Sequence, residues 1–210
     1  MNKPDESTIL NALTASTNWN GSTRGQPLTI SFSFISFLPD YYDPAAIAAS
    51  TNPKDQSAKD FMSMVDETNP ANFNSFTQNQ QLATYQAMLA WESVANITFN
   101  NAGVDNANAV ITLGSANFTA DHHGITTGRG NSLSEGQNHY YGDIWLNMSG
   151  AKGSANLNQT NPGQDGYETI LHELGHALGL EHPFLNSGES QLPGFEDQLH
   201  TTMSYNVMDG

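Results

Sequence analysis

The sequence has no cysteine, few basic residues and no long apolar run. The absence of cysteine excludes disulfides and thiolate metal ligands, so histidine, carboxylate and tyrosine oxygens are the donors left for a metal. Only 6 Lys and Arg stand against 21 Asp and Glu, and the formal net charge of -15 repels nucleic acid phosphates and anionic lipids. No stretch is apolar enough over the length needed to span a bilayer. We therefore expect neither nucleic acid nor membrane as a partner.

The amino-terminal segment shows neither a cleavable secretory signal nor clear periodicity. Met1–Leu10 is polar and contains Asp5 and Glu6, so it has neither the basic start nor the apolar run of a cleavable secretory signal. Residues 1–26 are rich in Asn, Ser and Thr with little periodicity, which predicts a loosely ordered entry segment. A chain of 210 residues can bury one substantial core, and no internal repeat or linker divides it. We expect a single domain over residues 1–210, present as a monomer.

Two segments have clear hydrophobic periodicity. Leu28–Phe34 alternates apolar and polar residues, which predicts a strand with one buried face. Gln78–Val94 contains neither Gly nor Pro, and Leu82, Tyr85 and Leu89 recur at helical spacing. This pattern predicts an amphipathic helix packed through those three side chains.

The remaining elements are shorter. The proline-containing stretch 38–77 predicts loops with one short helix around Ala58–Met64. Ile97–Phe99, Ala109–Leu113 and Tyr140–Leu146 are typical of short strands separated by Gly and Asn clusters. This mixed order of strands and helices predicts an α+β fold.

The most informative segment is 172–182, which reads HELGHALGLEH. On a helix of 3.6 residues per turn, His172 and His176 lie on one face and can bind one ion, with Glu173 beside them. Gly179 allows the chain to leave the helix through a left-handed conformation, which can bring His182 back as a third ligand. Three protein ligands leave a coordination position for water, as in catalytic zinc sites. We predict one zinc ion bound here.

The flanking residues support a helix at this site. Asp165 is a favourable N-cap with Glu168 three residues later. Leu171, Leu174 and Leu178 form an apolar stripe, so the histidines should face away from the core, toward a cleft.

Chance offers an alternative for part of this pattern, because two histidines four residues apart with a Glu between them occur in many helices. The third histidine, the turn glycine and the downstream sequence Met203-Ser204-Tyr205 favour metal binding.

Other histidines and acids carry weaker signals. Asp121-His122-His123 lacks a matching ligand spacing and is more typical of a surface loop than of a second metal site. His139 and His200 are single histidines and are not assigned to a site. Calcium is a second candidate ion, although an acidic surface supplies carboxylates by chance; the candidate ligands are Asp143, Asp165, Glu196 and Asp197.

These motifs resemble those of the metzincin metalloproteases, whose extended histidine motif is followed by a Met-turn. The serralysins are the most similar group. LAWESVANITF at 89–99 resembles their helix-to-strand junction, and YGDIWLN at 141–147 resembles the strand that precedes their active-site helix. The similarity extends over Leu28–Asn206, loosely at first and closely from Leu89.

The resemblance implies a fold and roles for particular residues. It implies a twisted mixed sheet with a long helix and an active-site helix in an upper lobe, residues 27–182, and a small lower lobe, residues 183–210. His172, His176 and His182 correspond to the zinc ligands, Glu173 to the general base and Met203 to the Met-turn. Tyr205 corresponds to a tyrosine that ligates zinc in the resting enzyme and then donates a hydrogen bond to the oxyanion; an ordinary core tyrosine is the alternative.

The resemblance also implies a function. We expect a zinc endopeptidase that cleaves extended polypeptides, secreted from the cell, with a proteinaceous inhibitor as a further candidate partner. Serralysins continue into a closing helix and a calcium-binding repeat domain, whereas this sequence ends seven residues after Met203. We expect a truncated lower lobe, in either a piece of a longer protein or a minimal relative. A zinc-containing binding module without activity is the alternative. The intact Glu173 favours the enzyme, because a structural zinc site has no use for a carboxylate beside an open coordination position.

Overall fold

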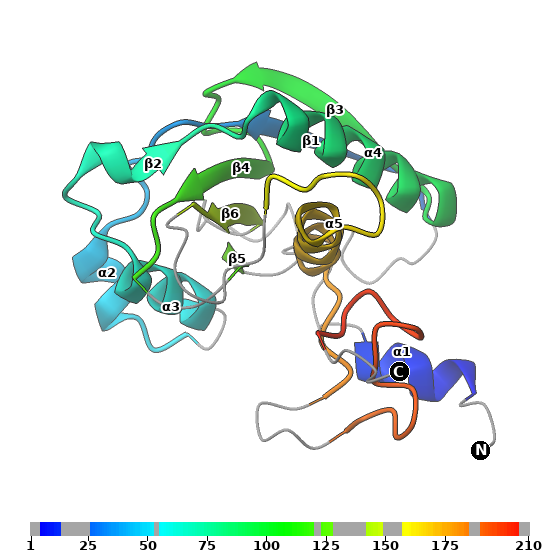
Figure 1. Ribbon diagram of the computed structural model, residues 1–210. Coiled ribbons are helices and arrows are strands. Elements are labelled where there is room, and N and C mark those ends of the chain that lie inside the picture. Colours follow the sequence, from blue (N-terminus) through cyan, green and yellow to red (C-terminus); the bar gives the residue numbers. More distant parts are fainter. Residues whose placement is uncertain are drawn as a thin grey trace.

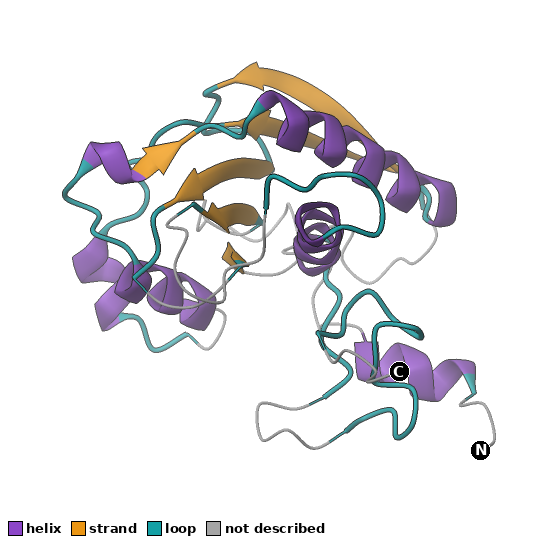
Figure 2. Cartoon of the chain, in the orientation of Figure 1, coloured by secondary structure: helices purple, strands orange, loops and turns teal. Residues whose placement is uncertain are grey.

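The computed structural model describes residues 5–13, 26–52, 55–119, 123–127, 142–148, 157–184 and 190–205. A twisted sheet fills the upper part of the molecule, and helix α1 lies beside the carboxy-terminal segment below it (Figure 1). The described residues after α5, 178–184 and 190–205, contain no further helix or named strand (Figure 2). In chain order the elements are α1 (Glu6–Leu13), β1 (Leu28–Phe34), α2 (Pro44–Ala49), α3 (Gln56–Met64), the 3-10 helix η2 (Pro70–Asn72), β2 (Phe73–Asn74), α4 (Gln78–Val94), β3 (Ile97–Val104), β4 (Ile111–Ala116), β5 (Gly124–Thr127), β6 (Asp143–Asn147) and α5 (Asp165–Ala177).

The sheet is mixed, with strand order β3-β1-β4-β6-β5 and the short β2 paired to β4. β1 pairs in parallel with both β3 and β4, and β4 pairs in parallel with β6. β5 runs antiparallel to β6, with Ile125 opposite Trp145. β5 is therefore the antiparallel edge strand of the described sheet, and α5 packs against it. This arrangement is the α+β fold that the order of elements predicts.

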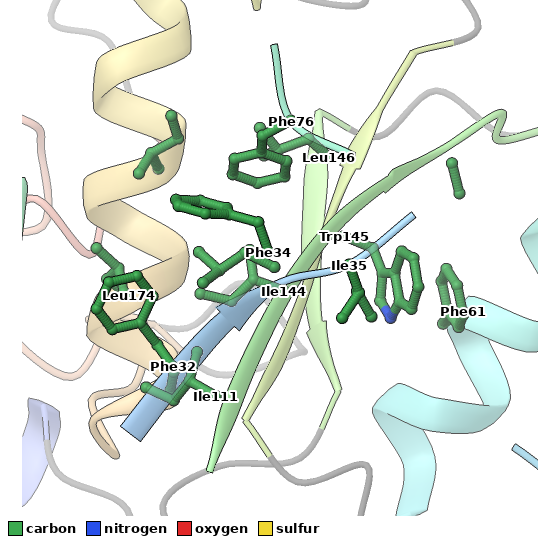
Figure 3. Close-up of a cluster of buried hydrophobic side chains, with 14 of the residues drawn as sticks. Phe32, Phe34, Ile35, Phe61, Phe76, Ile111, Ile144, Trp145, Leu146 and Leu174 are labelled. Atoms are coloured by element: carbon green, nitrogen blue, oxygen red, sulfur yellow. The ribbon is translucent and has the colours of Figure 1, made fainter. Parts of the chain in front are cut away.

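Helices cover both faces of the sheet. α4 and α5 pack against each other, and α5 also contacts β5 and β6. On the other face Phe61 of α3 stacks on Trp145, with ring centroids 5.0 Å apart and an interplanar angle of 13°. Figure 3 shows Phe61 and Trp145 on the side of the sheet opposite Leu174 of α5. Burial of apolar surface in these two layers is the main stabilising contribution and makes the sheet a firm base for α5.

The two strongest periodicities predict their elements to the residue. The strand at Leu28–Phe34 and the helix at Gln78–Val94 are confirmed. α4 begins with a capping box, in which Thr77 accepts from the Gln80 amide and the Gln80 side chain accepts from the Thr77 amide. The short helix predicted at Ala58–Met64 is also present and starts slightly earlier, at Gln56.

The buried face of α4 differs from the prediction. Leu82 and Leu89 are 56% and 63% exposed, and Tyr85, though it contacts the rings of Phe32 and Phe34, is 39% exposed. The buried face instead carries mostly small or polar side chains: Gln80, Ala83, Thr84, Ala87 and Met88. Small residues let α4 approach α5 and the sheet closely, so Leu82 and Leu89 do not lie on the face that packs.

Two further differences concern local structure. The amino-terminal segment contains α1, in which Ala12 is buried and the Leu13 carbonyl accepts from the Glu181 amide at 2.9 Å. Residues 14–25 of the predicted entry segment lie outside the described part. α5 begins at Asp165, so Gln164 and not Asp165 occupies the N-cap, without a side-chain cap.

The stretch 38–77 and the region before β6 also hold more structure than the sequence indicates. α2 forms because Asp43 accepts from the amides of Ala45 and Ala46, which satisfies two free donors at its start. The four-residue strand β5 is too short to show periodicity. Of the predicted strands, 97–99 extends to Val104, 109–113 shifts to Ile111–Ala116, and Tyr140–Leu146 corresponds to Asp143–Asn147, with residues 140 and 141 outside the described part.

No helix in the described ranges has both the length and the apolar character needed to cross a membrane.

Candidate metal centre

Three histidine rings converge at the end of α5. The Nε2 atom of His182 lies 3.2 Å from Nε2 of His172 and 3.1 Å from Nε2 of His176. Tetrahedral zinc with Zn–N bonds of about 2.0–2.1 Å holds its ligand nitrogens roughly 3.3 Å apart. Among the described residues this is the one group of three or more histidine, cysteine or acidic side chains that can hold a metal ion. Both the donor type and the spacing therefore fit zinc.

Backbone carbonyls fix the orientation of two of these rings. The Nδ1 atom of His172 lies 2.8 Å from the carbonyl oxygen of Thr202, and Nδ1 of His176 lies 2.8 Å from that of Leu180. Because a carbonyl oxygen can only accept, each Nδ1 must carry the proton. In the neutral ring Nε2 is then unprotonated and can bind a metal, as in zinc sites where the distal nitrogen donates to a carbonyl.

The end of α5 returns the chain to the metal centre. The Gly179 amide donates to the His176 carbonyl and the Leu180 amide to the Gly175 carbonyl, each at 2.9 Å. Gly179 has a φ of 95°, in the left-handed region that residues with a side chain rarely adopt. This turn reverses the chain at the carboxyl end of α5 and places His182 opposite the two histidines of that helix.

Glu173 lies on α5 between the first two histidines in sequence and is 6% exposed. The Thr126 hydroxyl lies 2.7 Å from Oε2 of Glu173 and 2.9 Å from its carbonyl oxygen. Gly124 leaves room for the same side chain, because a Cβ at this position would lie 3.3 Å from Oε1 of Glu173. The edge strand β5 therefore positions the carboxylate beside the metal centre.

The Met-turn packs directly beneath the helix. Met203 is 1% exposed, and its Sδ occupies the space that a Cβ on Gly175 would need. The Met203 amide donates to the Thr201 hydroxyl at 3.1 Å, and the Ser204 hydroxyl donates to the Glu196 carbonyl. The same turn presents the Thr202 carbonyl to His172. Met203 thus has a packing role, and its neighbour Thr202 sets the orientation of the His172 ring.

Tyr205 lies beside His182, the third histidine of the cluster. Its ring centroid is 5.1 Å from that of His182 and 4.6 Å from that of Phe184, and its residue is 61% exposed. This placement agrees with a side chain that can approach the metal, and it does not fit an ordinary core tyrosine. Its assignment as a metal ligand stays a prediction.

The weaker candidates do not gather into a second centre within the described ranges. Asp121, His122 and His139 lie outside those ranges, and the carbonyl of His123 accepts from the Asn147 amide at 2.8 Å. His200 pairs with Asp197 at 2.8 Å on the surface. Desolvation opposes ionisation of Asp197, but hydrogen bonds from His200 and the Leu199 amide outweigh it and hold its pKa below the ordinary value.

The candidate calcium ligands are dispersed. Asp143 is fully buried and accepts hydrogen bonds from hydroxyl groups, and Asp165 lies in the first turn of α5. Oε2 of Glu196 accepts from the Phe195 amide. Calcium binding stays a prediction.

Two contributors to the site were not predicted from the sequence. Thr126 reaches Glu173 across 47 residues, and Thr202 reaches His172 across 30. Neither lies in a motif, and both depend on tertiary packing, so no local signal could identify them.

Comparisons with known proteins agree with this geometry. The profile of the matrixin family (Peptidase_M10) matches residues 60–188, which include β5, β6, α5 and all three histidines. Serralysin G of Dickeya chrysanthemi is 28% identical over 151 residues, covering 70% of this chain and 31% of the relative. Serralysin of Photorhabdus sp. (strain Az29) is 31% identical over 146 residues, covering 63% of this chain and 28% of the relative. Serralysin C of Dickeya chrysanthemi is 35% identical over 136 residues, covering 63% of this chain and 27% of the relative.

The chain spans less than a third of the length of these curated relatives. The part matched by the family profile nevertheless contains the complete histidine cluster and every strand of the described sheet except β1, and it covers more than half of the chain. The chain belongs to the matrixin family of zinc-dependent metallopeptidases and has a metzincin-type catalytic domain.

Proposed function

We propose that this protein is a zinc-dependent endopeptidase that hydrolyses extended polypeptides, with Glu173 as the general base. The observation that carries the proposal is the convergence of three histidine Nε2 atoms beside a buried carboxylate on the same helix. His172, His176 and His182 would hold the ion, which supplies Lewis acidity and lowers the pKa of a bound water to about 7.

Three side chains around the metal centre have separate roles: proton transfer, orientation of the carboxylate and stabilisation of the oxyanion. Glu173 takes a proton from the attacking water and passes it to the leaving amine. The Thr126 hydroxyl, bonded to Oε2, keeps the carboxylate in one orientation. Tyr205 donates a hydrogen bond to the oxyanion of the tetrahedral intermediate, the role that the family resemblance implies.

The edge strand β5 provides a binding mode for the substrate. β5 pairs with β6 on one side, and within the described sheet no strand pairs with its other edge. A substrate in extended conformation can add to such an edge through main-chain hydrogen bonds. Because Thr126 lies on β5 and contacts Glu173, a peptide on this edge would pass the general base. We further propose that the protein acts outside the cell, as the resemblance to serralysins implies.

The experiment that tests this function is a digest of denatured casein before and after chelation. We expect cleavage by the zinc-loaded protein, no cleavage after chelation, and recovery when one equivalent of zinc is restored. A zinc-loaded protein that leaves every unfolded polypeptide intact would contradict the proposal and would support a binding module on the same scaffold.

A further inference from the structure

Three aromatic rings form a cluster on the outer side of the metal centre: His182, Phe184 and Tyr205. Phe184 lies almost parallel to His182, with ring centroids 5.3 Å apart and an interplanar angle of 10°. Tyr205 meets Phe184 at 72° and His182 at 80°, both edge-to-face arrangements. Phe184 therefore contacts both the third histidine and the tyrosine assigned to the oxyanion.

The backbones of Phe184 and Tyr205 are anchored on different segments. Phe184 forms an antiparallel bridge with Ser190, and the Gln191 amide donates to the Pro183 carbonyl at 2.8 Å. Tyr205 follows Ser204, which is 2% exposed and hydrogen-bonded to the Glu196 carbonyl. Both side chains thus project from fixed backbone, and their rings meet beside His182.

Tyr205 itself has few constraints on its ring. The residue is 61% exposed, and the two described aromatic rings that contact it are His182 and Phe184. His182 is committed to the metal centre by its Nε2 atom, so Phe184 is the contact that can favour one resting position of the phenol ring without being a ligand. An edge-to-face aromatic pair changes such an equilibrium by about two- to tenfold.

We propose that Phe184 is a positioning residue that holds Tyr205 beside the metal in the resting enzyme. The proposal deepens the proposed function, on which it rests, because it assigns the resting position of the tyrosine to one neighbouring ring. Phe184 touches neither the reacting atoms nor the ion; it acts through Tyr205. Removal of its ring should therefore change the behaviour of Tyr205 and leave the histidine cluster able to bind metal.

Copper-loaded protein provides a readout that does not depend on cleavage. A phenolate bound to Cu²⁺ absorbs visible light through charge transfer from oxygen to copper, and Tyr205→Phe should remove this band. We expect Phe184→Ala to weaken the band about two- to tenfold at unchanged copper content. Phe184→Leu keeps apolar bulk without an aromatic edge and should weaken it as well. Leu89→Ala, which alters an exposed apolar residue on α4, is the matched control and should leave the band unchanged.

A double-mutant cycle then separates a positioning role from a structural one. With peptide substrate, Phe184→Ala should change kcat about two- to tenfold in the presence of Tyr205 and not at all in the Tyr205→Phe background. Equal effects of Phe184→Ala in both backgrounds, a band of full strength in both Phe184 variants, or no band in the unmodified protein would each overturn the proposal. Cleavage by the unmodified protein alongside any of these results would leave the proposed function intact, whereas a Phe184-dependent band in a protein that cleaves nothing would support the positioning role and contradict the function.

Discussion

Asp143 and Glu173 are buried carboxylates in two different regions of the molecule. Asp143 is 0% exposed at the start of β6, and Glu173 is 6% exposed in the middle of α5. Each accepts a hydrogen bond of 2.7 Å from a threonine hydroxyl on a neighbouring strand. Burial and a hydrogen bond from a threonine are therefore common to both carboxylates and do not show which of them could act in catalysis.

The surroundings of Asp143 are those of a structural link. Thr112 donates to Oδ1, and Tyr41 and Tyr42 both donate to Oδ2 at 2.9 Å. These bonds tie the loop after β1 to the centre of the sheet. Desolvation raises the pKa of Asp143 to about 7, although the three hydroxyl groups favour the ionised form. A carboxylate enclosed in this way has no access to a substrate.

Glu173, unlike Asp143, lies beside the histidine cluster. Its neighbours along the helix are two histidines whose Nε2 atoms converge with that of His182. What separates Glu173, the proposed general base, from Asp143 is therefore the histidine cluster beside it and its contact with β5, the edge strand of the described sheet.

The largest effect should come from Glu173→Gln. Without a general base, kcat/KM for a peptide substrate should fall about 100- to 10,000-fold, because positioned acid–base groups contribute rates of this size. Zinc content should stay at one ion per chain, since the three histidines are unchanged. Asp143→Asn is the matched control and should keep kcat/KM within about threefold, because this residue lies outside the metal centre. Turnover retained by Glu173→Gln would refute its role as base.

The next largest effect is a pH dependence of stability that belongs to Asp143. Its pKa is about 7 in the folded protein and near the ordinary aspartate value of 3.8 in the unfolded chain, so the folded state binds more protons between these values. The free energy of unfolding should fall as the pH rises from about 4 to about 7, by up to about 4 kcal/mol, and this loss should be complete above that range.

Asp143→Asn isolates this contribution. The amide can still accept from the tyrosines through its oxygen and donate to Thr112, but it does not ionise. Urea unfolding of both proteins at several pH values gives the difference between their free energies of unfolding. We expect the unmodified protein to lose stability relative to Asp143→Asn as the pH rises; a difference that is constant with pH would contradict the assignment.

The smallest effects should come from the two threonines. Thr126→Val removes the hydroxyl that orients Glu173 and should lower kcat/KM about 10- to 150-fold, since a hydrogen bond to a charged group is worth about 1.5–3 kcal/mol. Thr112→Val should lower the free energy of unfolding by about 1–3 kcal/mol without changing kcat/KM, since it leaves a buried carboxylate short of one donor. Equal effects of the two substitutions on kcat/KM would remove the distinction between the carboxylates.

The sequence predicted those parts of the structure that depend on local periodicity. The strand at Leu28–Phe34 and the helix at Gln78–Val94 follow from spacing alone, and the turn after α5 follows from the glycine at 179. The face on which α4 packs was predicted wrongly, because close approach selects small residues such as Ala83 and Ala87 over the larger Leu82 and Leu89.

The candidate site likewise contains residues that the sequence predicts and residues that it does not. Three histidines and Glu173 lie within one short segment, so their spacing on a helix predicts that they converge. Thr126, Thr202 and Phe184 contribute through contacts that form only when distant segments pack together. The role of Asp143 shows the same limit, since the sequence suggested a calcium ligand and the structure encloses the side chain among three hydroxyl groups.

A zinc titration of the metal-free protein, with bound metal and peptide cleavage measured in the same samples, tests most directly whether the three histidines form a catalytic zinc site. We expect bound zinc and cleavage to rise together and reach a plateau at one zinc ion per chain, and we expect His182→Ala to lower zinc affinity and cleavage in parallel. Saturation of the three histidines with zinc and no cleavage, or full cleavage by the protein before any zinc is added, would contradict this expectation.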